Sequence, residues 1–429
     1  MKPFQAGVLI FFGVLALATV FIFATFSGNS GNSVGSVEVW GTLPKETMQD
    51  MLSDLRIRDG GFKDVDYREI SHGVFIETLT QAIAAGTGPD LILLENNQVV
   101  NEKDKILPIS FRTFSRRDFQ DSFVEAGEVY LSDSGPLGLP FYIDPFVVYW
   151  NRTLFSGAGI ARAPKYWDEF SDIAPRMTRA NENGTITQSA VALGEWQNVL
   201  YAKDILISLI VGLGNPIVSS NEDGELVSVL TERGDAPTPP AESALRFYTE
   251  FADPVKNVYS WNRSLANSRA TFLAGGLGVY IGRASEVFAL RSANPNLNFD
   301  VAAYPQVRDG VVAVPATLYA LSVPRGSSNP TGAAQVALAL TGLESQKLLV
   351  TLTGLPSVRR DVLSVSPDNE YEVIFRNAAL NAFSFRDPNP AATNSIFERM
   401  IEDVSSGRAR LPEAVRSGHN ALRSLLEVQ

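Results

Sequence analysis

The first 26 residues form an almost unbroken apolar stretch, which limits where the rest of the chain can fold. No charged residue occurs between Lys2 and Glu38, and residues 6–26 are nearly all apolar. A helix of about 21 residues is about 31 Å long, enough to cross a hydrocarbon core of about 30 Å. The sequence therefore predicts one transmembrane helix over residues 1–26, followed by a domain on the outer face of the membrane.

A cleaved secretory signal is the alternative interpretation of this stretch. Such signals have an apolar region of about 7–15 residues and a small-x-small cleavage site. The apolar region here is longer, and residues 24–26 (ATF) end in a large side chain. We therefore predict an uncleaved anchor, which Lys2 orients with its N-terminus in the cytoplasm. The Ser/Gly/Asn-rich residues 27–36 are expected to form a flexible linker before a folded domain at 37–429.

Charge and composition exclude several classes of function. The formal net charge is −11, and an acidic domain is repelled by nucleic acid and by anionic lipid. The chain has no cysteine, and His72 and His419 are its two histidines. Disulfides, a zinc cluster and a Ser-His-Asp triad are therefore not expected. We predict no metal and no cofactor.

Apolar periodicity predicts an α/β fold. Strands are expected at residues 37–40, 65–70 and 90–94, with helices at 45–57 and 73–85 between them, which is the pattern of a parallel sheet with crossover helices. Later strands are expected at residues 140–150, 278–282 and 311–323, and a hairpin-type turn within 219–240. Later helices are expected at residues 167–173, 199–213, 240–251, 264–274, 330–353, 370–382 and 391–429.

One pair of carboxylates raises the alternative of an enzyme. Glycosidases use two carboxylates that flank the scissile bond, and Asp144 and Glu195 are candidates for such a pair. A simpler interpretation has one carboxylate hydrogen-bonded to a ligand and the other solvated. We therefore predict a binding protein that is not an enzyme, and glycan hydrolysis remains the alternative.

Several segments resemble the family 1 extracellular solute-binding proteins, the sugar-binding components of ABC importers, of which maltose-binding protein is the familiar member. They are residues 37–42 (VEVWGT), 88–92 (GPDLI), 139–151 (LPFYIDPFVVYWN), 163–170 (APKYWDEF), 259–262 (YSWN), 272–280 (FLAGGLGVY), 354–360 (GLPSVRR) and 406–415. Tyr166 stands where the family usually has threonine. The order and spacing of these segments, over nearly all of residues 37–429, carry the resemblance.

The resemblance implies a two-lobed periplasmic-binding-protein-like fold with a ligand cleft between the lobes. It places the N-lobe at about 37–142 and 320–356, and the C-lobe at about 147–315 and 360–429. The implied function is capture of a carbohydrate outside the cytoplasm and its delivery to the permease subunits of an ABC transporter. We expect a monomer that closes on its ligand.

The same resemblance implies which residues bind the ligand. A sugar offers hydroxyl groups and apolar C–H faces, so its pocket needs aromatic faces and a few polar groups. The expected ligand-binding residues are Trp40, Thr42, Asn97, Asp144, Trp196, Trp261, Gly282 and Arg283.

The indole rings are expected to stack on sugar rings, and Asp144 to accept hydrogens from ligand hydroxyls. Gly282 would permit close approach of the backbone, and Arg283 would donate to a hydroxyl. Structural alternatives remain for four of these residues: Trp40 could fill the N-lobe core, Trp261 could pack in a core despite its polar loop, Asp144 could cap a turn, and Arg283 could form a salt bridge between the lobes.

The chain also departs from the family. Where maltose-binding protein has a tryptophan after the third strand, this chain has Leu94, so maltodextrin specificity does not transfer. Another polar solute, such as a polyol or a glycerol-phosphate ester, is the first alternative, and Arg283 would then contact phosphate. A ligand sensor that signals to a membrane partner is the second.

Overall fold

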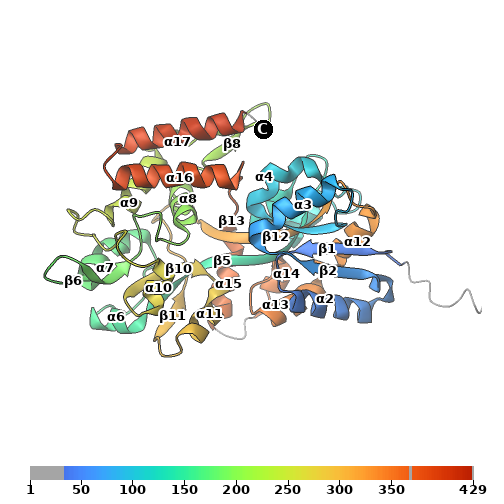
Figure 1. Cartoon of the computed structure of the whole chain (residues 1–429), viewed down its shortest axis with the longest axis horizontal. Coiled ribbons are helices and arrows are strands. Elements are labelled where there is room, and N and C mark those ends of the chain that lie inside the picture. Colours follow the sequence, from blue (N-terminus) through green and yellow to red (C-terminus); the bar gives the residue numbers. More distant parts are fainter. Residues whose placement is uncertain (1–32, 367–369, 428–429) are drawn as a thin grey trace, which may run out of the picture.

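The computed structural model describes residues 33–366 and 370–427, and these form two α/β lobes (Figure 1). The strands are β1 (Val37–Gly41), β2 (Val65–Glu69), β3 (Leu91–Glu95), β4 (Ile106–Leu107), β5 (Leu139–Asn151), β6 (Arg179–Ala180), β7 (Ile186–Val191), β8 (Val218–Ser220), β9 (Leu226–Ser228), β10 (Leu277–Arg283), β11 (Phe299–Ala302), β12 (Val314–Pro324) and β13 (Ala382–Phe383). All but the β8–β9 hairpin belong to one connected sheet, whose main order is β2-β1-β3-β12-β5-β10-β7-β6.

Helices cover both lobes. Before β10 the helices are α2 (Lys45–Arg58), α3 (Phe75–Ala84), α4 (Val99–Glu102), α5 (Arg116–Ser122), α6 (Arg152–Gly157), α7 (Phe170–Met177), α8 (Ala202–Gly212), α9 (Pro240–Glu250) and α10 (Ser268–Leu273). After β10 they are α11 (Glu286–Ala293), α12 (Pro330–Leu340), α13 (Leu343–Thr353), α14 (Arg360–Leu363), α15 (Glu370–Leu380), α16 (Pro390–Ser405) and α17 (Leu411–Leu426).

The first strands form the parallel sheet that the sequence predicts. β1 pairs in parallel with β2 and with β3, and Val39 lies opposite both Tyr67 and Leu91. Helix α2 connects β1 to β2, and α3 connects β2 to β3. The buried face of α2 carries Met48, Met51, Leu52 and Leu55. Burial of this apolar face against the sheet explains why a helix with a modest apolar pattern is stable here.

Two long strands join the lobes. β12 pairs antiparallel with β3 and with β5 on the N-lobe side, where Leu318 lies opposite Ile143. β5 continues into the other lobe and pairs antiparallel with β10, with Val148 opposite Ile281. Figure 1 shows β5 running across the middle of the molecule between the two groups of helices.

Each lobe has its own hydrophobic core. The N-lobe core lies mainly between Val34 and Ile143 and between Leu318 and Leu363. The C-lobe core lies mainly between Phe146 and Val314 and between Phe375 and Leu422. Tyr142 packs against both cores. Two separately packed cores connected by a few strands can rotate relative to one another without losing their internal packing.

Several predicted elements have different limits in the structure. The helix expected over 330–353 is divided into α12 and α13 at Thr341 and Gly342. The helix expected over 391–429 is divided into α16 and α17 by residues 406–410, where Gly407 has a φ of 72°. Only a glycine adopts this left-handed conformation without strain, so the helix ends there.

The predicted membrane anchor lies outside the described residues. Among residues 33–366 and 370–427, no helix has both the length and the apolar composition needed to span a bilayer. The folded part of the chain begins earlier than expected, because Val34, within the predicted linker, is buried in the N-lobe core. Its backbone N–H donates to Gly61 O at 3.1 Å, and its carbonyl accepts from Asn329 Nδ2 at 2.7 Å.

Candidate functional site

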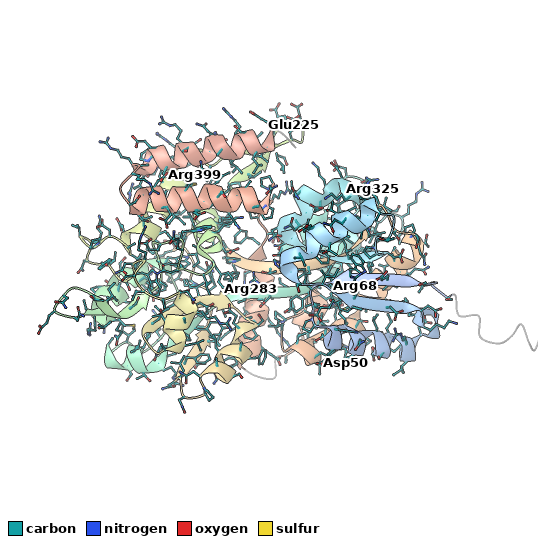
Figure 2. The ribbon with its side chains drawn as sticks, viewed as in Figure 1. Asp50, Arg68, Glu225, Arg283, Arg325 and Arg399 are labelled. Atoms are coloured by element: carbon teal, nitrogen blue, oxygen red, sulfur yellow. The ribbon has the colours of Figure 1, made fainter. Side chains whose placement is uncertain are left out.

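A pocket of about 230 Å³ lies between the lobes, and we call it the interlobe pocket. Most of its lining side chains are polar, and they come from both lobes and from β12: His72, Glu95, Asn96, Asn97, Lys203, Asp204, Ile207, Arg283, Pro315, Ala316, Thr317, Phe383, Phe385, Asp387, Pro390 and Asn394. Figure 2 shows Arg283 at the centre of the molecule, between the two lobes. Open α/β sheets commonly bind ligands where strands end, and Glu95 and Arg283 are the last residues of β3 and β10.

The N-lobe wall is organised around Glu95. His72 Nε2 lies 2.7 Å from Glu95 Oε2, and Asn97 Nδ2 donates to Glu95 Oε1 at 2.9 Å. The hydrogen bond to Glu95 raises the pKa of His72, which favours the protonated imidazolium. Asn97 Oδ1 is buried and accepts no hydrogen bond from the described residues. This amide oxygen is therefore available to a donor on a ligand.

The C-lobe wall is organised around Arg283. Its guanidinium carbon lies 5.2 Å from the centre of the Tyr201 ring, at a distance typical of a cation–π contact. The Tyr201 hydroxyl donates to Glu286 Oε1 at 3.0 Å, which fixes the ring beneath Arg283. Arg283 Nε is buried and has no hydrogen-bond acceptor among the described residues. A buried donor without an acceptor costs about 1–3 kcal/mol, a cost that a bound ligand can remove.

Tyr201 has an unusual backbone conformation for its residue type. Its φ is 63° and its ψ is 26°, in the left-handed region, directly before α8. The ring of Phe146 packs edge-on against its ring at 4.9 Å. Strained residues of this kind cost about 1–3 kcal/mol and concentrate at ligand sites, where surrounding contacts hold them in place.

Two charged residues at the start of α8 complete the C-lobe wall. Lys203 Nζ lies 2.6 Å from Asp387 Oδ2 and donates to Thr393 Oγ1 at 2.8 Å, which joins α8 to α16. Asp204 is half-buried, and burial raises the pKa of its carboxyl, whereas the charges of Arg283 and Lys203 oppose that shift. No group of three or more acidic or histidine side chains within the described residues is arranged to hold a metal ion.

Two of the eight predicted site residues, Asn97 and Arg283, line the interlobe pocket. Thr42 is half-buried and is not among the residues that line it, and its side chain interacts with Tyr319 on β12. Because Tyr319 lies opposite Glu95 in the sheet, Thr42 supports the N-lobe wall from behind.

Asp144 is placed differently from the prediction. It is buried, and its carboxylate accepts from the backbone N–H of Ser285 at 3.0 Å and from the Ser285 hydroxyl at 2.5 Å. These bonds join β5 to the turn that follows Arg283, so Asp144 positions the pocket wall from behind. Glu195 belongs to a separate network, in which it pairs with Arg263 at 3.0 Å. The two carboxylates considered as a glycosidase pair therefore hydrogen-bond to different segments.

None of the three predicted stacking tryptophans lines the interlobe pocket, and burial in the lobe cores corrects the prediction for Trp261 and Trp40. Trp261 is fully buried in the C-lobe core, and its indole N–H donates to Asn198 Oδ1 at 2.9 Å. Trp40 is buried in the N-lobe core, and its indole N–H donates to Glu38 Oε1 at 2.7 Å. Trp196 is half-buried and packs against the C-lobe core. The polar residues beside Trp261 in the sequence favoured an exposed loop, but Asn198, 63 residues away in the chain, accepts the indole N–H inside the fold.

Gly282 is also explained by packing. A Cβ atom at this position would lie 2.7 Å from Tyr280 Cε1 and 2.8 Å from Glu286 Oε1. The glycine therefore makes room for the Tyr280 ring and the Glu286 carboxylate. The predicted role in close approach to a ligand is not needed to account for it.

Replacing Gly282 with alanine is expected to destabilise the protein by about 1–3 kcal/mol, because the new methyl group overlaps the Tyr280 ring. Gly276→Ala is the matched control, since the nearest atom to its Cβ would be 3.5 Å away, an ordinary contact. Thermal unfolding of the two variants measures the difference. Equal melting temperatures would show that strand β10 tolerates a side chain at the position before Arg283.

Most pocket residues were missed by the sequence analysis, although some carried a signal. Asn96 and Asn97 directly follow the apolar strand β3, and Lys203 and Asp204 precede the apolar residues of α8. Polar residues at the ends of buried elements are candidates for a site. Phe383, Phe385 and Asp387 carried no such signal, because only the return of the chain across the lobes brings this segment to the pocket.

Comparison with known proteins identifies the family. The profile of the bacterial extracellular solute-binding protein family matches residues 58–347. A binding protein of Brucella abortus is 23% identical over 188 residues, a match that spans 43% of this chain and 43% of the relative.

Solved structures of low identity share the fold. A cyclo/maltodextrin-binding protein in complex with maltotetraose matches with a TM-score of 0.72 and 15% identity, over 94% of this chain and 99% of that chain. An ABC transporter solute-binding protein from Thermotoga lettingae, bound to α-D-tagatose, matches with a TM-score of 0.68 and 20% identity. The match covers 91% of this chain and 99% of that chain. With the two-lobed architecture and the family match over residues 58–347, the chain belongs to the bacterial extracellular solute-binding proteins.

Proposed function

We propose that the protein captures a carbohydrate in the interlobe pocket and delivers it to the permease of an ABC transporter. One observation carries the proposal: Arg283 Nε and Asn97 Oδ1, a buried donor and a buried acceptor from opposite lobes, line the same pocket without partners among the described residues. A hydroxyl group both donates and accepts hydrogen bonds, so a ligand with several hydroxyls can satisfy both groups at once. The sugars bound by structures of the same fold support this choice.

The pocket argues against the phosphate-ester alternative. Its lining holds three carboxylates, and two of them are already paired, Asp387 with Lys203 and Glu95 with His72. A phosphate group would have to leave water and enter a pocket whose charges are largely paired, so no net attraction would offset its lost hydration. Specific phosphate sites instead gather several cations or a helix N-terminus around the anion.

Capture by closure follows from the two-lobed arrangement. A ligand that contacts Asn97 in one lobe and Arg283 in the other binds the closed form more tightly than the open form. The difference between the two binding free energies sets how far the population shifts toward the closed form. We propose that the lobes rotate about the chain junctions near residues 142–147, 315–320 and 356–360. The closed form would then be the one that the permease recognises.

We also propose that residues 1–26 hold this domain on the outer face of the cell membrane. The support is the apolar sequence of residues 6–26 together with membership of an extracellular family. Retention of the full chain in washed membranes, and release of a chain truncated before Ser33, would test the anchor.

Addition of a suitable carbohydrate is expected to raise the melting temperature of the full chain by about 3–5 °C at a hundredfold excess over the dissociation constant. Because residues 6–26 are apolar, the chain should be kept in a detergent without a sugar headgroup. Arg283→Met should abolish the shift, since it removes the buried donors. Arg117→Met, at a side chain that is 89% exposed, is the matched control and should retain it. A shift with amino acids or phosphate esters, and none with any carbohydrate, would overturn the proposed function.

A further inference from the structure

We propose that the ligand of the interlobe pocket is a neutral, single-ring sugar, and that Asp204 and Arg283 together determine this specificity. The inference rests on the proposed carbohydrate-binding function and narrows its substrate class. It follows from how the charges of the pocket are paired, from which polar groups remain without a partner, and from the size of the pocket.

The charged groups of the pocket largely cancel. Lys203 pairs with Asp387 at 2.6 Å, and His72 pairs with Glu95 at 2.7 Å. The remaining charged groups that line the pocket are Arg283 and Asp204. They attract one another electrostatically but form no ion pair within 4.0 Å among the described residues. A pocket with paired charges offers no net attraction to a charged ligand, and a neutral ligand loses the least hydration on entering it.

Asp204 and Arg283 also have the greatest remaining capacity for hydrogen bonds. Arg283 donates no side-chain hydrogen bond to any described residue, and the carboxylate of Asp204 accepts none from another described side chain. A guanidinium presents a rigid fork of donors, and a carboxylate presents acceptors. Neighbouring hydroxyls of a sugar can accept from Arg283 and donate to Asp204 at the same time.

The apolar part of the pocket fits a small ligand. All five tryptophans lie within the described residues, and none of them lines the pocket. Phe383, Phe385 and Ile207 instead provide apolar surface for the C–H faces of a ring. The volume of about 230 Å³ is below the about 300–1,000 Å³ of pockets that hold drug-sized ligands. An oligosaccharide would extend beyond the pocket and would lack a row of indole platforms.

The first test compares matched ligands by calorimetric titration of the full chain in the same sugar-free detergent. Neutral hexoses are compared with their uronate and 6-phosphate counterparts, and with di- and trisaccharides of the same units. We expect a neutral single-ring compound to bind at least about tenfold more tightly than its charged counterpart, because the anion loses more hydration and gains no net attraction from the paired charges of the pocket. We expect no gain in affinity from a second or third sugar unit.

The second test uses Asp204→Asn, which keeps the size of the side chain and removes its charge. Affinity for the neutral ligand should fall by about tenfold, because a hydrogen bond to a charged acceptor becomes one to a neutral acceptor. The preference for the neutral ligand over its uronate should fall as well, a change that a purely structural role of Asp204 would not produce. Asp172→Asn, at an exposed position on α7, is the matched control and should change neither value.

Failure of this inference differs from failure of the proposed function. Tighter binding of oligosaccharides or uronates than of neutral single-ring compounds would overturn the inference and leave carbohydrate binding intact. Unchanged selectivity in Asp204→Asn would also overturn it. Binding of zwitterionic amino acids, with no carbohydrate bound, would overturn both.

Discussion

Replacing Trp261 with alanine is expected to lower the free energy of unfolding by about 3–5 kcal/mol, the range found when buried tryptophan or phenylalanine is truncated. The indole is fully buried in the C-lobe core, so its removal leaves a large cavity. Its N–H bond to Asn198 Oδ1, at 2.9 Å, is lost as well. Guanidinium unfolding of the full chain, followed by circular dichroism, measures the change.

Trp261→Phe separates packing from ligand contact. Phenylalanine keeps most of the apolar ring and leaves Asn198 Oδ1 without the indole donor, so a smaller loss of about 1–3 kcal/mol is expected. Asn198 also donates to the backbone oxygens of Asn262 and Leu265, and these bonds should hold the loop in place. Ligand affinity of Trp261→Phe should equal that of the parent chain. Loss of affinity without loss of stability would restore the stacking role that the sequence suggested.

The second large effect is expected at Asp90, where Asp90→Ala should destabilise the protein by about 3 kcal/mol. The Asp90 carboxylate accepts hydrogen bonds from Glu38 N–H at 3.1 Å and from Ser327 Oγ at 2.9 Å. It also accepts from Ser328 N–H and Asn329 N–H, at 2.9 and 3.0 Å. These bonds join β1 and β3 to the loop before α12, so their loss loosens one edge of the N-lobe.

Asp66→Ala is the matched control for this prediction. The Asp66 side chain is 87% exposed, and its contact with Arg56 is 3.4 Å long. Exposed ion pairs of this kind contribute about 0–1 kcal/mol. If Asp90→Ala were no more destabilising than Asp66→Ala in urea unfolding, the network around Asp90 would not stabilise the N-lobe.

The contribution of Asp90 should depend on pH. Burial alone raises the pKa of this carboxyl, but the hydrogen bonds from Glu38, Ser327, Ser328 and Asn329 together hold it below its ordinary value of 3.8. A lowered pKa in the folded state means that the unfolded chain binds the proton more tightly. The stabilisation by Asp90 is therefore complete when the pH is above the pKa of the carboxyl in the unfolded chain. It is lost as the pH falls through the lower pKa of the folded state. The stability difference between the parent chain and Asp90→Asn should shrink correspondingly below about pH 4.

The N-lobe was the part of the fold most accessible from sequence. The apolar strand β3 and the helices α2 and α3 are short, periodic and bounded by turn residues, so local pattern and tertiary structure agree. Helix α11 and strand β7 were not predicted, because apolar residues do not recur at a regular spacing in residues 286–293 and 186–191. Contacts with neighbouring elements of the sheet and core stabilise both.

The site was less accessible, and the tryptophans show why. Residues beside Trp261 are polar, which favours an exposed loop when they are read locally. In the structure Ser260 is fully buried, and its hydroxyl oxygen accepts from the backbone N–H of Ala190 in β7, whereas Asn262 stays half-buried. The distant Asn198 bonds the Trp261 indole and the loop at Leu265. Whether a polar neighbour faces solvent or satisfies a buried group depends on partners far along the chain, and local pattern does not contain them.

By itself the sequence determined the acidic, cysteine-free character of the domain, the α/β alternation and the resemblance to a two-lobed binding family, because composition and periodicity are local properties. The resemblance also pointed to Asn97 and Arg283, two of the residues that line the interlobe pocket. Only the tertiary structure decided that Asp144 hydrogen-bonds Ser285 behind the pocket and that the indoles are outside it. The pocket itself is made of β3, α8, β10, β12 and the chain before α16. Segments so distant in sequence meet only when two cores are packed and joined by crossing strands, so side-chain direction at the site is set by long-range packing.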